Sequence, residues 1–144
     1  MVGLDQYLLA KIKGKETGNL TGACGGLFPI APKSNKTEIG YWRKHYALDR
    51  LIAEIKGFDE DEDGWDDMNC KDIRLTKSQC QKIKDYAICE MQEMEEWYHG
   101  DVQKLMDSND GWDYSQWLKT MTIMDAALKA IEKDRATIYY KYWR

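Results

Sequence analysis

The segment 42–46, WRKHY, places two aromatic rings, two cations and a histidine in consecutive positions. Cations in the first turn of a helix lie beside free N–H groups and bind anions, and an aromatic ring stacks on a base or on a cation. The segment therefore predicts a site in which Arg43 and Lys44 bind phosphate while Trp42 or Tyr41 stacks on a ring. In the alternative interpretation, the rings of this segment are core residues and both cations are solvated.

The end of the chain, residues 136–144, carries a second group of aromatic and basic side chains in the sequence ATIYYKYWR. Its alternation and its β-forming residues predict a closing strand that pairs with the sheet. We expect the basic end of this strand, with Lys141, Trp143 and Arg144, to close the same ligand site. The alternative is that these aromatic residues only pack along an edge strand.

Acidic side chains are concentrated between residues 59 and 67. Four of them have the spacing of a calcium-binding loop, namely Asp59, Asp61, Asp63 and Asp67. Gly64 stands where such a loop turns sharply, but Cys70 occupies the position of the bidentate glutamate. The pattern therefore favours a solvated acidic loop over residues 58–70, with calcium binding as the alternative.

Charge and composition exclude several classes of protein. The formal net charge is −4, and without the seven acids of the acidic run the remaining chain carries +3. This excess of positive charge is compatible with an anionic ligand but is too small to indicate binding to duplex nucleic acid. An acidic N-terminus and the lack of a long apolar stretch predict a cytoplasmic protein with no membrane partner.

Neither a catalytic set nor a cofactor motif can be recognised. The two histidines, His45 and His99, have no motif around them, and the four cysteines have no CxxC spacing. The glycine-rich segment 18–26 lacks the Gly-Lys-Ser/Thr ending of a phosphate-binding loop and the GxGxxG order, so we interpret it as a connector. We expect no cofactor, no enzymatic activity and reduced thiols, with Cys80 and Cys89 packing as small apolar residues in a helix.

Periodicity predicts one α+β domain over residues 1–144, in which a small antiparallel sheet of N-terminal, YWRK and C-terminal strands packs with about three helices. A capping box of Thr76 and Gln79 opens the longest helix, and Gln6 is the polar exception in the first strand. The expected strands cover 2–12, 37–42 and 136–144, with a further short strand over 72–75. The expected helices cover 43–56, run from Thr76 to a break near His99, and start near Tyr114, with a separate turn over 102–106. A mobile Gly/Pro loop over 14–36 and the acidic loop complete the chain.

Two segments carry a family resemblance, GLDxYL at 3–8 and EIGYWRK at 38–44. The chain resembles a group of small phage and prophage proteins that open with an "MGLDMYL"-like strand and carry a YWRK element running into a helix. Segments 64–67 and 110–117 and the Tyr-rich tail are similar to further elements of that group. The chain departs from the pattern at Val2, at Gln6, in the acidic run and at 46–48.

The resemblance implies an accessory protein made during infection, and many proteins of that kind block host defence. We therefore expect a binder that sequesters a small anionic, nucleotide-derived immune signal and that forms a homo-oligomer. One alternative is a protein-protein inhibitor that presents its acidic loop and aromatic surface to a host protein. Another is an enzyme that uses His45 or His99 beside a carboxylate.

Overall fold

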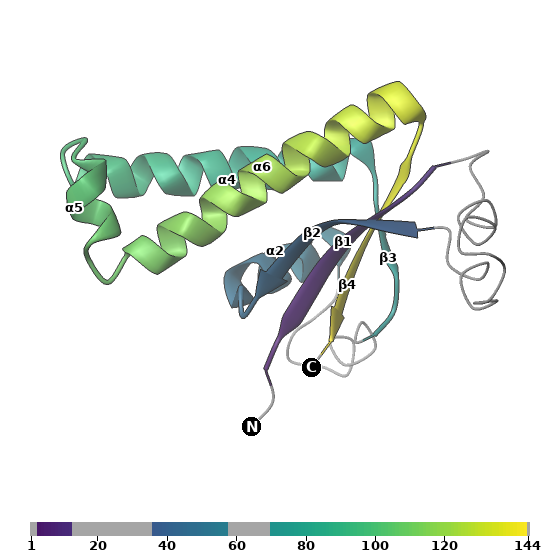
Figure 1. Ribbon diagram of the computed structural model, residues 1–144, viewed down its shortest axis with the longest axis horizontal. Coiled ribbons are helices and arrows are strands. Elements are labelled where there is room, and N and C mark those ends of the chain that lie inside the picture. Colours follow the sequence, from purple (N-terminus) through teal and green to yellow (C-terminus); the bar gives the residue numbers. More distant parts are fainter. Residues whose placement is uncertain (1–2, 13–35, 58–69, 144) are drawn as a thin grey trace, which may run out of the picture.

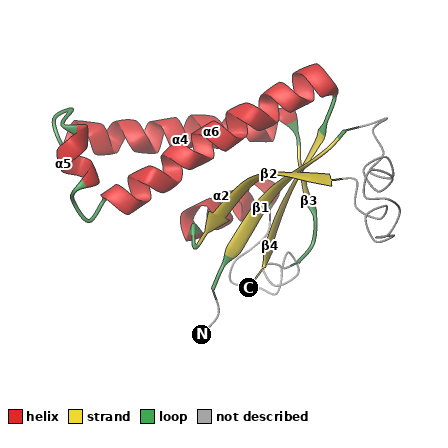
Figure 2. Ribbon diagram, viewed as in Figure 1, coloured by secondary structure: helices red, strands yellow, loops and turns green. Residues whose placement is uncertain are grey.

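The computed structural model describes residues 3–12, 36–57 and 70–143. The calcium candidates Asp59, Asp61, Asp63 and Asp67, nearly all of the Gly/Pro loop, and Arg144 lie outside this part of the chain. The fold is α+β, as the sequence predicts. An antiparallel sheet packs against helices through one of its faces (Figures 1 and 2).

The sheet has the strand order β2-β1-β4-β3. Its strands are β1 (Asp5–Lys11), β2 (Lys36–Arg43), β3 (Ile73–Leu75) and β4 (Thr137–Trp143). The closing strand β4 is therefore not an edge strand among the described strands, because it pairs with β1 on one side and β3 on the other. Its alternation explains this position, since Ile138, Tyr140 and Tyr142 all point into the core.

Two long helices form an antiparallel pair that extends beyond the sheet, and a short helix closes their far end (Figure 1). The described helices are α2 (Tyr46–Lys56), α4 (Lys77–Trp97), α5 (Val102–Met106) and α6 (Gly111–Asp134). The predicted capping box opens α4, and Gly57 ends α2 in the left-handed conformation. The start of the first predicted helix was wrong, because β2 continues to Arg43 and α2 begins only at Tyr46.

The core fills the space between the sheet and the helices. Leu4, Leu8 and Ala10 point into it from the N-terminal strand, together with apolar residues of α2, α4 and α6. Of the two cysteines expected to pack inside α4, Cys80 is buried, but Cys89 is exposed because it lies on the solvent face of the helix.

Gln6, the polar exception, is also buried and is the centre of a hydrogen-bond network. Its Nε2 donates to the carbonyl oxygen of His45 (2.9 Å) and to the hydroxyl of Tyr140 (3.0 Å), and its Oε1 accepts from the N–H of His45 (2.8 Å). The Tyr140 hydroxyl donates in turn to Asp49 Oδ1 at 2.6 Å. Because buried polar groups are costly unless paired, this network fixes the turn that joins β2 to α2.

Strand β2 also packs closely against α6. A Cβ atom added at Gly40 would lie 2.4 Å from Cγ2 of Ile123. We expect Gly40→Ala to lower the free energy of unfolding by about 1–3 kcal/mol through overpacking. Chemical denaturation would measure this, and Ile123→Ala in the same chain should relieve part of the cost. Strictly additive effects of the two substitutions would contradict this packing.

Candidate functional site

Strand β1 brings the two predicted aromatic and basic clusters together. Asp5 is paired with Arg43 of β2 on one side and with Trp143 of β4 on the other. Paired residues of neighbouring strands point to the same face, so these side chains form a row across the sheet. This is the face opposite the one on which the helices pack.

The next row of the same face is formed by Tyr41, Tyr7 and Lys141. The rings of Tyr7 and Tyr41 have their centroids 5.3 Å apart. The Tyr41 hydroxyl donates to Asp5 Oδ1 at 2.7 Å, and this bond raises the pKa of Tyr41. Four of the seven residues predicted to bind a ligand therefore share one face of the sheet.

Trp42 and Lys44 lie elsewhere. Trp42 points into the core, has no exposed surface, and donates through Nε1 to Thr120 Oγ1 at 2.9 Å. Its indole therefore offers no face to a ligand, and the stacking role expected of it is not available. Lys44 is exposed but follows the end of β2, so neither it nor Arg43 lies in the first turn of a helix.

A cavity of about 230 Å³ lies where the end of β2 meets the first turns of α6. We call it the basic cavity, and it is lined by Tyr41, Arg43, Trp112, Ser115, Gln116 and Lys119. These six residues include two cations and no carboxylate. The cavity thus combines positive charge with two aromatic rings, which is the combination that the sequence predicted for Tyr41 and Arg43.

Hydrogen bonds hold the two walls of the basic cavity in place. Gln116 Nε2 donates to the carbonyl oxygen of Arg43 at 2.9 Å, which ties α6 to the end of β2. Thr120 Oγ1 donates to the carbonyl oxygen of Gln116 at 2.7 Å while it accepts from the buried indole of Trp42. Trp42 therefore positions the site from beneath.

Sequence reasoning missed Trp112 and Lys119. Trp112 is 54% exposed, which makes its indole available to a ligand. The available signal was the helical spacing of 112, 115, 116 and 119, which places these residues on one face of α6. That this face meets Arg43 is a tertiary contact that no local pattern reveals.

A second cavity, of about 310 Å³, lies on the other side of Trp112. We call it the aromatic cavity, and it is lined by Lys44, His45, Tyr46, Ala47, Tyr86, Glu90, Met94, Trp112, Asp113 and Trp117. His45 is only 3% exposed, and its ring lies edge-on to Trp117 with centroids 4.5 Å apart. Its Nε2 is buried and has no hydrogen-bond partner among the described residues.

Burial, with a smaller contribution from the positive charge of Lys119, lowers the pKa of His45 from 6.5 to about 4. Between these values the unfolded chain binds more protons than the folded one, so the free energy of unfolding falls as the pH falls. From pH 7.5 to pH 5 we expect His45 to contribute a loss of about 2 kcal/mol. Urea denaturation of the native chain and of His45→Phe at both pH values would measure this loss of stability. An equal loss in the two proteins would contradict its assignment to His45.

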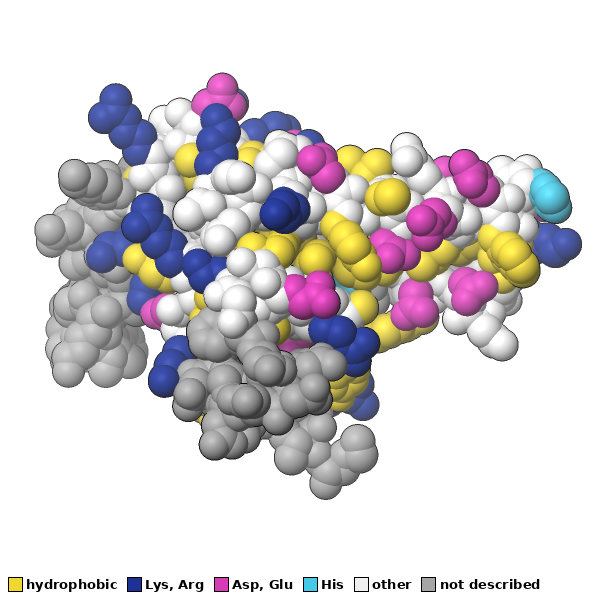
Figure 3. All heavy atoms as spheres, turned by 180° about the vertical axis from the view of Figure 1, so that it is seen from behind, with side chains coloured by type: hydrophobic (Ala, Val, Ile, Leu, Met, Phe, Trp, Pro, Cys, Tyr) yellow, Lys and Arg dark blue, Asp and Glu magenta, His cyan; other side chains and the backbone are white. Residues whose placement is uncertain are grey.

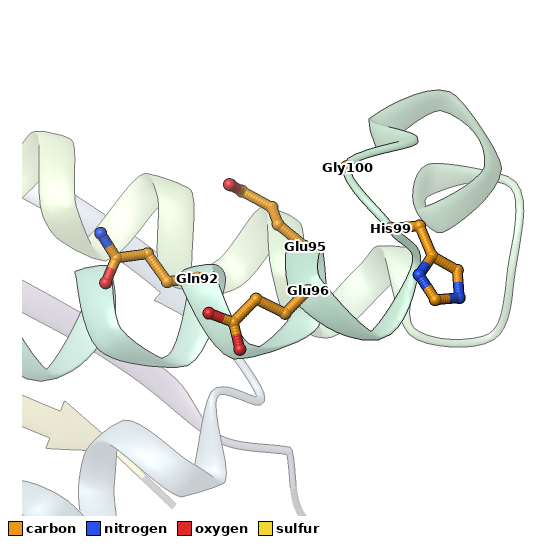
Figure 4. A pocket seen from close by; sticks show the side chains of 5 residues that line it. All are labelled: Gln92, Glu95, Glu96, His99 and Gly100. Carbon is orange, nitrogen blue, oxygen red and sulfur yellow. The ribbon is translucent and has the colours of Figure 1, made fainter.

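The hollow near the end of α4 has a volume of about 670 Å³ and is lined by Gln92, Glu95, Glu96, His99 and Gly100. Figure 4 shows that the side chains of Gln92, Glu95, Glu96 and His99 point in different directions. The Glu95 carboxylate already accepts from the Tyr114 hydroxyl at 2.6 Å, which raises the pKa of Tyr114 to about 12. The His99 side chain and these carboxylates therefore do not converge on a common point.

Within the described ranges, the acidic, cysteine and histidine side chains form no group that could hold a metal ion. None of the described helices is long and apolar enough to cross a bilayer. Comparisons with known protein families, curated proteins and solved structures found no match for the chain.

Proposed function

We propose that this protein is a phage accessory protein of the host cytoplasm that binds a small anionic, nucleotide-derived molecule in the basic cavity. By sequestering that molecule it would withhold an immune signal from a host defence effector. The observation that carries the proposal is the meeting of Arg43 and Lys119 with two exposed rings in one cavity whose described lining has no carboxylate. The phage setting rests on the resemblance of segments 3–8 and 38–44.

In the proposed complex, the guanidinium of Arg43 binds a phosphate through two parallel hydrogen bonds, and Lys119 supplies the second charge. The indole of Trp112 stacks on the base, and the ring of Tyr41 lies on the opposite wall. Lys141 and Trp143 lie further across the sheet face, beyond Asp5 and Tyr7 of β1. A cavity of about 230 Å³ is smaller than most pockets that enclose a drug-sized ligand. We therefore propose that a second subunit completes the enclosure.

Isothermal titration calorimetry with cyclic mononucleotides, cyclic dinucleotides and ADP-ribose derivatives tests this function. The uncharged nucleosides serve as matched controls, because they retain the base and lack the phosphate. We expect saturable binding of at least one phosphate-bearing compound, weakened by added salt, and much weaker binding of its nucleoside. Silence across the whole panel would contradict the proposal.

A second candidate function, the inhibition of a host protein, is favoured by the exposed tryptophans. Trp97 at the end of α4 is 79% exposed, and Val102 and Met106 of the neighbouring α5 are also exposed. Exposed tryptophans are frequent anchors of protein interfaces. The acidic loop of this hypothesis lies outside the described residues. Capture of one defined host protein that is lost in Trp97→Ser, and also on neutralising Asp59 to Asp63, would favour this function over the first.

A further inference from the structure

The aromatic cavity differs from the basic cavity in both shape and charge. Three exposed rings surround it, since Tyr46 is 44%, Tyr86 42% and Trp112 54% exposed, and Trp117 lies deeper. Exposed rings of this size rarely gather around one hollow without a ligand or a partner. The faces of such rings carry partial negative charge, which attracts cations.

Acidic side chains lie around the same cavity. Glu90 and Asp113 are part of its lining, against a single cation, Lys44. Interaction with Glu90 raises the pKa of the Tyr86 hydroxyl, and burial and the negative charge of Glu54 act in the same direction. In Figure 3 acidic and hydrophobic side chains are interspersed along the part of the molecule that the helices form, whereas most Lys and Arg side chains lie towards the sheet. A phosphate would be repelled from this cavity.

His45 supplies an independent observation. Its side chain is 97% buried in the cavity wall, since only 3% is exposed, and its Nε2 lacks a partner in the described part of the protein. A buried polar atom without a partner is rare in a folded protein, and a bound water, ion or ligand is one explanation for it. In the tautomer that carries its proton on Nδ1, a neutral imidazole presents a lone pair at Nε2 to an N–H donor.

We propose that the aromatic cavity binds an organic cation, an alkylammonium or quaternary ammonium group, between the rings of Tyr46, Tyr86 and Trp112. Glu90 and Asp113 balance its charge, and His45 Nε2 accepts a hydrogen bond when the cation carries an N–H. A volume of about 310 Å³ is at the lower end of the range for small-molecule pockets. It suits a small amine or the end of one lysine side chain. This site shares Trp112 with the basic cavity, but the rest of its lining and its charge are different.

A pair of isosteric probes tests the proposal on the full chain. Choline carries a trimethylammonium group, and 3,3-dimethylbutan-1-ol has the same shape without the charge. We expect choline to give saturable shifts of the Tyr86 and Trp112 ring signals in NMR titrations, and the alcohol to bind at least about tenfold more weakly. Equal affinity for the two probes, or no saturable binding of choline and of spermidine, would overturn the proposal.

A matched pair of variants separates local charge from net charge. Glu90→Gln keeps an acceptor for the Tyr86 hydroxyl and removes the carboxylate charge, so choline affinity should fall at least threefold. Glu96→Gln, further along the same helix and outside the cavity lining, should leave that affinity unchanged. Equal losses in the two variants would overturn the assignment of the cation to this cavity.

The affinities of two further ligands, spermidine and a short peptide with a central lysine, distinguish between the possible sources of the cation. Tighter binding of spermidine identifies a free amine as the natural ligand, and tighter binding of the peptide identifies a side chain of another protein. Acetylation of the peptide lysine removes its charge and should abolish binding. Failure of these cations to bind, with nucleotide binding intact, would leave the proposed function standing and reject only the cation site.

Discussion

Replacement of Arg43 and Lys119 together by glutamine is expected to weaken the binding of a phosphate-bearing ligand by more than 100-fold. Both residues are cations that line the basic cavity, and the Asp5 carboxylate beside Arg43 already accepts a hydrogen bond from Tyr41. A hydrogen bond to a charged group contributes about 1.5–3 kcal/mol, so losing two removes about 3 kcal/mol or more. A factor of ten in affinity corresponds to about 1.4 kcal/mol. Calorimetry with the tightest nucleotide of the panel measures the change.

The control for this variant is a second double substitution that removes the same net charge elsewhere. Lys133→Gln lies on α6 about 20 Å from Lys119, and Lys77→Gln lies at the start of α4. We expect the control variant to change affinity less than threefold, through weak long-range electrostatics only. Equal losses in the two variants would show that net charge, and not the basic cavity, attracts the ligand.

Trp42 and Trp112 are expected to have different roles at the same site. Trp42 supports the site from the core and stabilises the fold, whereas Trp112 lines the cavity and contacts the ligand. Trp42→Ala should lower the free energy of unfolding by about 3–5 kcal/mol, because it leaves a large cavity in the core and removes the donor to Thr120. Trp112→Ala should change it by only about 0.5 kcal/mol, since over half of that side chain is exposed. Urea unfolding curves of both variants measure the difference.

In binding measurements the order of the two tryptophans should be reversed, with the larger loss of affinity on substitution of Trp112. Trp112→Ala removes the proposed stacking surface, and a base–aromatic stack contributes about 1–3 kcal/mol, so nucleotide affinity should fall at least about fivefold. Trp42→Phe keeps a buried ring but loses the bond to Thr120, so its affinity should fall less than that of Trp112→Ala at a temperature where the variant is folded. A large loss of stability in Trp112→Ala, with affinity retained, would mean that Trp112 is a packing residue.

The error over Trp42 has a simple physical origin. Neighbouring residues of a strand point to opposite faces, so Tyr41 and Trp42 cannot both lie on the ligand face once β2 extends to Arg43. The predicted strand over 37–42 already contains both residues, so its alternation alone excludes one of them from that face. The strand alternation that places Tyr41 and Arg43 together is the same alternation that sends Trp42 into the core.

Local patterns predicted the elements well because their causes are local. The capping box of Thr76, the left-handed Gly57 and the break near His99 all depend on residues within a few positions of each other. Gln6 is the polar exception on the apolar face of the first strand, and the period of two places it inside, where it is buried. Its partners are His45, the N-cap of α2, and Tyr140 of β4, and no sequence pattern predicted them.

The basic cavity could be predicted only in part. Tyr41 and Arg43 were identified because their types and spacing are local, whereas Lys119 and Trp112 reach them through the packing of α6 on β2. The aromatic cavity was not predicted, because its lining comes from α2, α4 and α6. Sites between elements depend on tertiary contacts, which single-sequence reasoning does not supply.

The central claim is that the basic cavity receives the anionic ligand, and NMR of labelled protein tests it most directly. On titration with the tightest nucleotide, we expect the Arg43 Nε–H and Trp112 indole N–H signals to shift together to saturation. The Trp42 indole N–H, which is bonded to Thr120 inside the core, should move little. Saturable binding that leaves the Arg43 and Trp112 signals unmoved would contradict the account.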